Sequence, residues 1–371
     1  MTPQKRPFSS GPTGTPVTES IIQSIRDFRG TGISVLDFPH REELILDRMK
    51  AFDSLMRRIV GISDEYAIIP FSCGCSDHFN LWITNVLRVG ARPRKIAYLR
   101  SGFWSDKALA EAQRLEKVGE CEVSVIEHAD PQFRSLPDMS YLQMRRPLDA
   151  DFLYVVANET TQGVRLPYET ITSNLPFHVV ADFSSCFLEG PLDVSKYGII
   201  FLGAQKGLGP AGLSIVIIRR DLIGQKDNPH VPLSKSYAVQ AKEGGLYNTP
   251  NFLAIESVCL MLEWIEKHGG LTAMEAQSKE RAAYVYGAIG ASKRFYAPVV
   301  EAARSRTNPV FCPYELIHFE QFLSFCKERG IEFVKGHRSA GNSLRLGLFN
   351  GKPMESVYAF GKTLEEFERT A

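Results

Sequence analysis

A lysine and an aspartate, each placed where an apolar segment ends, could together serve a cofactor that carries an aldehyde. Lys206 follows the apolar segment 198–203 and lies in the glycine-rich loop 204–212. Asp182 ends the preceding apolar segment, 178–182. If both segments are neighbouring strands of an open α/β sheet, the amine and the carboxylate face one crevice at the strand ends. Pyridoxal phosphate requires this pair, because a lysine binds its aldehyde and a carboxylate keeps its pyridine nitrogen protonated.

Simpler interpretations of these two residues stay open at this point. Lys206 could be a loop lysine without a role, and Asp182 could be a buried carboxylate that caps a turn with Ser184 and Ser185. The stretch 207–212 matches GxGxxG, the dinucleotide fingerprint. Pro210 interrupts it, however, and the apolar run LSIVII follows where that motif requires a helix. The sequence therefore disfavours a Rossmann dinucleotide site.

A phosphate-bearing cofactor also needs an anion site, and residues 73–76 have the composition for one. Cys73, Gly74, Cys75 and Ser76 follow an apolar segment and precede a helical pattern over 77–87. Small residues at a helix N-terminus present free backbone N–H groups to a phosphate. The spacing of Cys73 and Cys75 is too short for an ordinary metal site, so we interpret both as packing residues and predict no metal ion.

The apolar pattern predicts the sheet that would position these residues. Several segments are apolar at nearly every position, as strands covered by helices on both faces must be. Helical patterns lie between them, such as the one that follows Ser105, a good N-cap, and ends at Gly119. The predicted strands are 65–70, 95–99, 123–127, 151–157, 178–182, 198–203 and 213–219. The expected architecture is α/β and doubly wound, with a mainly parallel sheet.

The pattern changes after residue 250. Helices are predicted over 252–268, from there to about 289, over 315–329 and after Pro353, with a short strand at 331–334. We therefore expect a large domain over 17–265. A smaller α+β domain would be formed by 1–16 and 266–371.

Composition excludes several classes of function. The 371 residues include 43 Lys+Arg and 42 Asp+Glu, a net charge of +1 that offers no electrostatic footprint for nucleic acid or an anionic membrane. No apolar run approaches the roughly 18 residues of a membrane span, and the first 16 residues lack the apolar core of a signal peptide. The seven cysteines are scattered, which favours neither a disulfide framework nor a zinc ribbon. We expect a cytoplasmic protein without nucleic-acid or membrane partners.

Beyond these patterns, long segments resemble the phosphoserine aminotransferases, a family in the class V group of fold-type I PLP enzymes. The longest segment is ADFSSCFLEGPLDVSKYGIIFLGAQKGLGPAG, residues 181–212, which contains both Asp182 and Lys206. The others are PFSSGPTGTP at 7–16, PHREE at 39–43, GFWSDKA at 102–108, ANETTQG at 157–163, YNTP at 247–250, RSRTNPVF at 304–311 and KGHRSAGNSLR at 335–345. They occur in the family's order, so the resemblance covers nearly the whole chain.

The resemblance implies a fold-type I PLP-transferase, with a seven-stranded, mainly parallel sheet in the large domain and a smaller C-terminal α+β domain. It also implies transamination of 3-phosphooxypyruvate with L-glutamate, which gives O-phospho-L-serine and 2-oxoglutarate in serine biosynthesis. The implied cofactor is pyridoxal 5'-phosphate. The implied assembly is a homodimer with shared active sites.

Carried over by position, the resemblance assigns a role to each matching residue. Lys206 would form the Schiff base and shuttle the substrate's α-proton, and Asp182 would pair with the pyridine nitrogen. Trp104 would stack on the ring, and Thr160 would hydrogen-bond its phenolic oxygen. The residues implied at the phosphate are Gln205, the backbone of Cys75 and Ser76, and Asn248 and Thr249 of the other subunit. Those implied at the substrate's anionic groups are His40 and Arg41, again from the partner, with His337, Arg338 and Arg345.

The sequence departs from the family pattern at three places. Residues 73–79 replace the glycine-rich GG(A/G)xxQF turn and add Asp77, an acid that is unfavourable near a phosphate unless it caps its own helix. Glu42 and Glu43 follow the histidine–arginine pair, and the stretch 339–344 is one residue longer than expected. These changes leave the cofactor residues intact but fall on loops implied to face the substrate.

Three alternatives to the implied reaction therefore stay open. A divergent class V aminotransferase would act on a different acidic amino acid or 2-oxo acid in a specialised pathway. A cysteine desulfurase or β-lyase would need a mobile nucleophilic cysteine, for which Cys312 is the candidate. A PLP-free binding protein would need the placement of Lys206 and Asp182 to be accidental.

Overall fold

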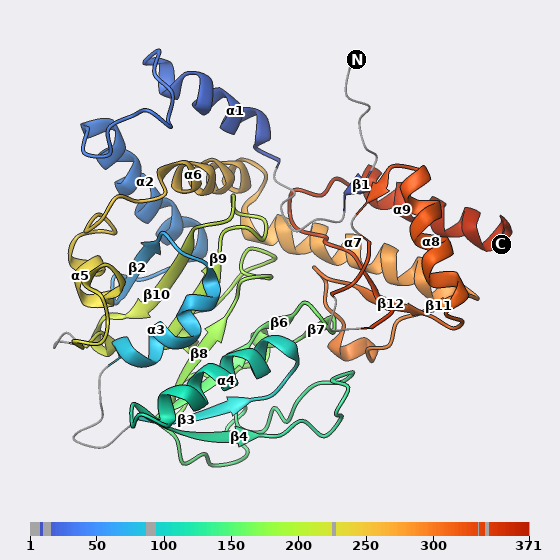
Figure 1. The fold of residues 1–371 in the computed structure, drawn as a ribbon, viewed down its shortest axis with the longest axis horizontal. Helices are drawn as coiled ribbons and strands as arrows, with labels where there is room; N and C mark the ends of the chain where they lie inside the picture. The colour runs from blue at the N-terminus through green and yellow to red at the C-terminus, as the bar shows by residue number, and fades with distance from the viewer. Residues whose placement is uncertain are drawn as a thin grey trace.

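The computed structural model describes residues 8–9, 16–86, 94–224, 228–332, 334–337 and 341–370. Its centre is a seven-stranded sheet in the order β2-β10-β9-β8-β5-β3-β4 (Figure 1). Its strands are β2 (Tyr66–Phe71), β3 (Arg94–Leu99), β4 (Cys121–Ile126), β5 (Phe152–Val156), β8 (His178–Asp182), β9 (Ile199–Gly203) and β10 (Ser214–Arg219). Each of these was predicted from the sequence, with ends that differ by no more than two residues.

The sheet is mainly parallel, as expected. β4, β3, β5, β8 and β9 pair in parallel. β10 runs antiparallel to both of its neighbours, β9 and β2. The predicted α/β fold with a mainly parallel seven-stranded sheet is therefore confirmed.

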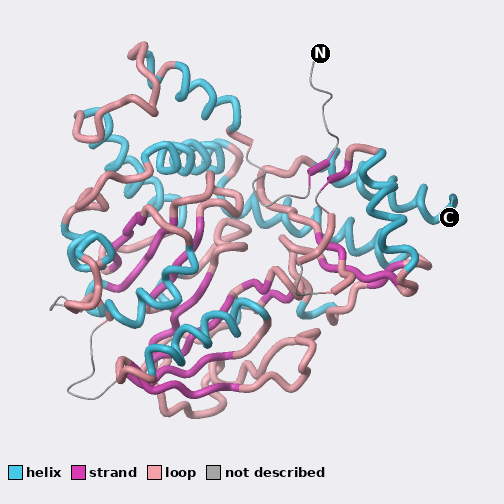
Figure 2. The backbone as a smooth tube through the Cα atoms, in the orientation of Figure 1, coloured by secondary structure: helices cyan, strands magenta, loops and turns pink. Residues whose placement is uncertain are grey.

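Helices cover both faces of the sheet because its strands are apolar on both faces (Figures 1 and 2). In β5, Leu153 and Val155 pack in the core beneath α1, α2 and α6, whereas Tyr154 and Val156 pack in the core beneath α3 and α4. This alternation follows from the two-residue period of a strand. The helices of the first face are α1 (Thr18–Arg26), α2 (Glu43–Val60) and α6 (Phe252–Lys267), and those of the second are α3 (His78–Asn85), α4 (Phe103–Glu116) and α5 (Tyr237–Lys242).

The C-terminal part builds a separate core cluster. Its helices are α7 (Gly270–Ala291), α8 (Ile317–Glu328) and α9 (Met354–Thr370), and its strands are β11 (Phe295–Tyr296), β12 (Val310–Pro313), β13 (Ile331–Glu332) and β14 (Leu344–Arg345). β1 (Phe8–Ser9) pairs in parallel with β13, so residues 8–9 lie against this part (Figure 1). Helix α7 contributes to two cores: Met274 packs in the core beneath α1, α2 and α6, and Val285 packs in the core of the C-terminal part. The division into 17–265 and the remainder stays a prediction.

Two local expectations differ from the structure. The helix expected after Ser105 begins at Phe103, and the Ser105 hydroxyl oxygen accepts hydrogen bonds from the N–H groups of Ser101 and Gly102. The helix expected over 77–87 is a 3₁₀ turn, Cys75–Asp77, followed by α3. The other 3₁₀ turns are Phe28–Gly30, Tyr168–Thr170, Val194–Lys196, Arg220–Leu222, Leu233–Lys235 and Glu301–Ala303. Within the described ranges, no helix has both the length and the apolar character needed to cross a bilayer.

Candidate active site

The sheet brings Asp182 and Lys206 to the same edge. β8 and β9 are parallel neighbours, and Asp182, the last residue of β8, is in register with Phe201 of β9. Lys206 follows three residues after the end of β9. The Asp182 carboxylate is 8 % exposed and accepts a hydrogen bond of 2.8 Å from the Ser184 N–H. The amine and the carboxylate therefore lie at the carboxyl ends of adjacent strands, as the sequence predicted.

Burial changes the ionisation of both groups. It lowers the pKa of the Lys206 amine from its ordinary value, and the charge of Asp182 opposes this change. Burial raises the pKa of the Asp182 carboxyl, and the Lys206 charge and the Ser184 hydrogen bonds oppose it. Among the described residues, none accepts a hydrogen bond from Lys206 Nζ. The amine is thus held near a carboxylate while remaining available to a ligand.

An aromatic side chain lies over the Lys206 amine. Nζ of Lys206 is 5.2 Å from the ring centroid of Trp104, in the first turn of α4. The Trp104 indole Nε1 donates a hydrogen bond of 2.9 Å to the Thr160 hydroxyl. Thr160 follows directly on the two-stranded ribbon strand β6 (Asn158–Glu159), which pairs with β7 (Val164–Arg165). Trp104, Thr160 and Lys206 are thus brought together from three separate segments.

One residue of this group was not predicted from the sequence. The Glu159 carboxylate, 1 % exposed, accepts hydrogen bonds from the N–H groups of Trp104 (2.9 Å) and Ser105 (2.8 Å). Burial raises the pKa of Glu159 to about 7, and these N–H groups oppose the change. The signal for it was an acidic residue just past an apolar strand, at the same sheet edge as Asp182.

Arg345 supplies a cation beside this group. It ends β14, and its guanidinium donates a hydrogen bond of 3.1 Å to the backbone oxygen of Thr160. Burial lowers the pKa of Arg345, and its charge in turn lowers the pKa of Lys206. No carboxylate of a described residue forms an ion pair with it. A half-buried arginine without an acidic partner is suited to an anionic ligand.

The other residues implied at the substrate are only partly placed near this group. The His337 ring lies 4.8 Å from that of Phe103 and 6.4 Å from that of Trp104. Arg338 lies outside the described residues. His40 and Arg41 are located in the loop before α2, and no hydrogen bond or ring contact described for the single chain joins them to Lys206 or Trp104.

The turn predicted to bind phosphate lies next to Asp182. Cys75 is buried, and its Sγ is 3.1 Å from the Ser184 hydroxyl oxygen, two residues after Asp182. The first internal hydrogen bond of the turn runs from the Asp77 N–H to the Gly74 oxygen, so the N–H groups of Cys75 and Ser76 precede it. Ser76 is exposed.

Asp77, the acidic residue by which this turn departs from the family pattern, forms an ion pair with Lys235. An Asp77 carboxylate oxygen lies 3.8 Å from Lys235 Nζ, and the side chain does not cap α3. Asp77 therefore does not take the capping role that the sequence left open for it.

Of the remaining residues implied at the phosphate, Gln205 lies next to Lys206, whereas Asn248 and Thr249 lie in a different loop. Gln205 is half-buried, and its side chain folds over Gly203, where an added Cβ would lie 2.4 Å from Gln205 Oε1. Asn248 and Thr249 are exposed in the loop before α6, and the Asn248 side-chain oxygen accepts a hydrogen bond of 2.7 Å from Gln240. The single chain does not bring these two residues into contact with the Lys206 group.

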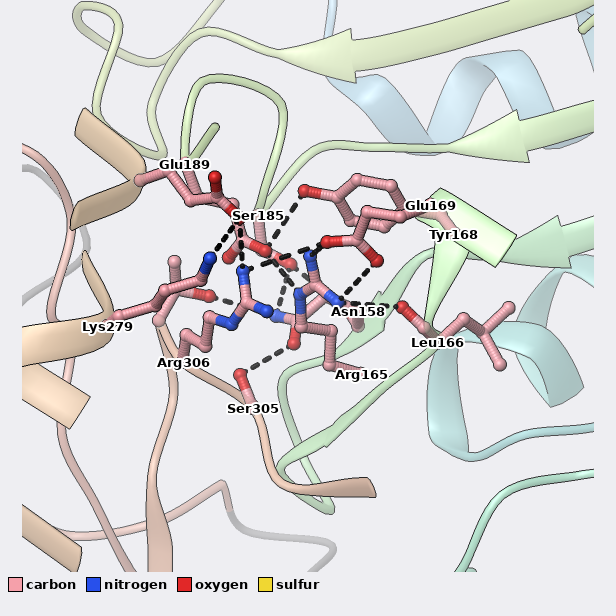
Figure 3. Close-up of polar contacts among 12 residues, drawn as sticks. Asn158, Arg165, Leu166, Tyr168, Glu169, Ser185, Glu189, Lys279, Ser305 and Arg306 are labelled. Carbon is pink, nitrogen blue, oxygen red and sulfur yellow. Dashed lines mark hydrogen bonds and ion pairs between the residues drawn. The ribbon is translucent and has the colours of Figure 1, made fainter. Parts of the chain in front are cut away.

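A polar network anchors the β6–β7 ribbon to the C-terminal part (Figure 3). The Asn158 side chain donates hydrogen bonds to Ser185 (2.7 Å) and Thr307 (3.2 Å), and accepts one from Ser305 (2.6 Å). Beside it, Arg165 pairs with the buried Glu189. Because Glu159 and Thr160 follow Asn158 directly, this network holds the segment that contacts Trp104. Among the described residues, no group of His, Cys, Asp and Glu side chains could hold a metal ion.

Comparison with known proteins gives consistent matches over the full length. Residues 8–362 match the family model described as aminotransferase class-V. The phosphoserine aminotransferase of Listeria innocua is 36% identical over 363 residues, which cover 97% of this chain and 95% of that protein.

Solved structures of phosphoserine aminotransferases are also similar to this chain over nearly its whole length. The PLP-bound phosphoserine aminotransferase from Trichomonas vaginalis has a TM-score of 0.87 at 31% identity and covers 96% of this chain and 99% of that one. The phosphoserine aminotransferase from Bacillus circulans subsp. alkalophilus has a TM-score of 0.89 at 29% identity, over 98% of both chains.

Proposed function

Because the chain belongs to the phosphoserine aminotransferases, a group within the class-V aminotransferase family, we propose that it transfers the amino group of L-glutamate to 3-phosphooxypyruvate. The products are O-phospho-L-serine and 2-oxoglutarate, as in serine biosynthesis. The observation that carries the proposal is that Lys206 lies close enough to buried Asp182, past the ends of adjacent parallel strands, for their charges to interact, beside an arginine without an acidic partner among the described residues.

The residues present fit pyridoxal phosphate. Lys206 has a lowered pKa, which favours the neutral amine that reacts with an aldehyde. Buried Asp182 can hold a proton on a ring nitrogen, and Trp104 offers a flat ring above the amine. The N–H groups at the start of the 75–77 turn suit a phosphate. When bound, the cofactor supplies an aldehyde that takes the amino group and a ring that withdraws electrons from the α-carbon.

Each side chain then has a defined task. With the cofactor bound, the Lys206 amine would take up the proton that the substrate's α-carbon loses and would later donate a proton, so that it would act first as a base and then as an acid. Asp182 would hold the pyridine nitrogen of the cofactor and would stabilise the protonated form of that nitrogen through its negative charge. Trp104, whose indole N–H donates a hydrogen bond to the Thr160 hydroxyl, would orient the cofactor ring and shield it from water. Arg345 binds the substrate carboxylate through its planar guanidinium.

The second anionic group of the substrate requires further cations. His337 is next to Trp104 in the described structure, and we assign Arg338 to the same task from the resemblance. We propose that His40 and Arg41 reach this site from the partner subunit of a homodimer, and that Asn248 and Thr249 of the partner complete the phosphate site. Exposure of Arg41, Asn248 and Thr249 in the single chain supports this assignment. A cytoplasmic location suits an enzyme of amino-acid synthesis with free cysteines.

Covalent labelling tests the proposal at the residue that carries it. Borohydride reduction of the holoenzyme should fix a pyridoxyl group on the peptide that contains Lys206, and Lys206→Ala should lose conversion between the amine and aldehyde forms of the cofactor. Lys196→Ala is a control, because Lys196 lies in the 3₁₀ turn 194–196 and its amine donates a hydrogen bond to the backbone oxygen of Glu169. A label on another lysine, or a Lys206→Ala enzyme that still transaminates, would contradict the assignment.

The alternatives have less support. The matches over nearly the whole chain to phosphoserine aminotransferases do not favour a divergent substrate. Burial raises the pKa of Cys312, which is unfavourable for the nucleophile of a desulfurase. Half-reactions with phosphoserine, serine, glutamate and alanine separate these substrates directly, and only phosphoserine and glutamate should convert the cofactor efficiently.

A further inference from the structure

We propose that Glu159 is a positioning residue, which fixes the place and plane of the Trp104 ring through the N-terminus of α4. This inference rests on the proposed function, since it concerns the ring that would stack on the cofactor. Neither the motifs nor the chemistry of transamination assign a task to this carboxylate. Its contacts do.

The carboxylate acts as a cap that comes from another part of the chain. Oε2 of Glu159 accepts the Trp104 N–H at 2.9 Å, and Oε1 accepts the Ser105 N–H at 2.8 Å. Oε1 also accepts a hydrogen bond of 3.3 Å from the Ser101 hydroxyl. The first N–H groups of a helix have no partner within it, and a carboxylate there is stabilised by the helix dipole. The Glu159 side chain therefore caps the second and third N–H groups of α4, and the Gln162 side-chain oxygen accepts the first, that of Phe103, at 3.1 Å.

The same short segment also holds the Trp104 side chain. Thr160, next in sequence to Glu159, accepts the indole N–H at 2.9 Å. Trp104 is thus bound to residues 159–160 at two points, its backbone N–H and its indole N–H. Two points fix both the position and the rotation of a side chain, whereas the indole bond alone would leave the backbone free to shift.

The fit around the carboxylate is tight at Gly102. A Cβ at this position would lie 2.7 Å from Glu159 Cδ and 2.6 Å from the Gln162 side-chain oxygen. Any side chain at residue 102 must therefore displace both the Glu159 carboxylate and the Gln162 side-chain oxygen, which accept the first N–H groups of α4. Gly102→Ala offers a second way to disturb the cap while the acid itself is kept.

A measurement on the tryptophans tests the proposal without the cofactor. The chain has three tryptophans, Trp82, Trp104 and Trp264, so protein grown on fluorotryptophan gives three fluorine NMR signals, of which Trp104→Phe identifies one. Glu159→Gln keeps one accepting oxygen and places an amide against the other N–H. We expect the Trp104 signal to shift or broaden in Glu159→Gln and in Gly102→Ala, while those of Trp82 and Trp264 stay in place.

A matched variant separates positioning from a general loss of stability. Glu256→Gln removes another buried carboxylate, which pairs with Arg48 between α6 and α2. It should lower the melting temperature without moving the Trp104 signal. In the holoenzyme at a temperature where all variants are folded, the dissociation constant for pyridoxal phosphate should rise about tenfold in Glu159→Gln, or about 1.4 kcal/mol, and stay unchanged in Glu256→Gln.

The outcomes distinguish this inference from the proposed function. A Trp104 signal that is unchanged in both Glu159→Gln and Gly102→Ala overturns the positioning role, even if borohydride labels Lys206. An equal shift of all three tryptophan signals overturns it too, because it indicates general unfolding. A shift confined to Trp104 supports it, even if Lys206 fails to bind the cofactor, in which case the proposed function alone has failed.

Discussion

At the scale of single residues, the site is built from buried and half-buried charges whose desolvation is only partly compensated by neighbouring charges. Burial raises the pKa of Asp182 and lowers the pKa of Lys206, so it favours the neutral form of both groups. The charge of each residue opposes the pKa shift of the other. Arg345 has no acidic partner among the described residues. Such groups cost stability when they are alone, and ligands of opposite charge offset this cost. The ligand-binding residues should therefore be those whose loss affects activity more than stability.

Replacement of Arg345 tests this expectation. Arg345→Ala should lower kcat/KM for both glutamate and phosphoserine by about 10- to 100-fold, since a charge-assisted hydrogen bond contributes about 1.5–3 kcal/mol. Steady-state kinetics with each substrate measures the effect. Arg114→Ala, on the exposed side of α4, is the control and should leave both values unchanged. Equal losses in the two variants would argue against a substrate contact.

A buried histidine next to the phosphate turn predicts a pH dependence. His78 is fully buried, its Nδ1 lies 2.9 Å from the Tyr237 hydroxyl oxygen and its Nε2 lies 2.8 Å from that of Ser214. Burial lowers the pKa of His78 to about 3. Between pH 6.5 and 3 the unfolded chain binds a proton that the folded chain does not, so acid destabilises the folded state by up to about 1.4 kcal/mol per pH unit from this group.

Urea unfolding of wild type and His78→Gln over this pH range measures that contribution. Glutamine can donate and accept hydrogen bonds but does not titrate, so the variant should lose less stability than the wild type as the pH falls. Parallel curves for the two proteins would show that His78 does not titrate on unfolding in this range.

At the scale of elements, the parts that form locally were predictable and those that form by distant contacts were not. Most of the seven central strands are apolar at nearly every position, β4 alternates apolar with polar residues, and these patterns alone located the strands. The start of α4 was misplaced because its cap, Glu159, comes from a strand more than 50 residues away in sequence. Strands β6, β7, β11 and β14 have two residues each, too few for any periodicity. Residues 40–41 and 248–249 were assigned by resemblance, and a single chain does not bring them to Lys206.

The hydrogen-bond network around Asn158 joins strand β6 to the segment 305–308 of the C-terminal part. Asn158→Ala should remove the buried acceptor of the Ser305 hydroxyl and the donor to the hydroxyl oxygens of Ser185 and Thr307, and an unsatisfied buried group costs about 1–3 kcal/mol. We expect lower stability to urea and faster proteolysis in the loop 305–308. Ser305→Ala removes only one of these contacts and should have a smaller effect. A variant at Asn158 as stable as the wild type would contradict the coupling.

At the scale of the whole molecule, the proposed dimer divides each site between two subunits. Lys206→Ala and Arg41→Ala should each be inactive, because one lacks the reactive amine and the other the partner's cation. After subunit exchange, half of the mixed dimers' sites would be intact, so part of the activity should return. Activity assays before and after mixing, with exchange confirmed by differently tagged subunits, measure this. No recovery despite exchange would mean that each subunit supplies its own Arg41.

The parallel pairing of β1 with β13 also constrains how the protein is made. Ribosomes add about 5–20 residues per second, so residues 8–9 leave the ribosome on the order of 20–60 s before residues 331–332 exist. The strands of the central sheet are complete by residue 219, long before that. The nascent chain therefore carries an unpaired N-terminal strand throughout the folding of its largest part. It acquires its partner only when synthesis is nearly finished, which makes the joining of the two chain ends one of the last steps of biogenesis.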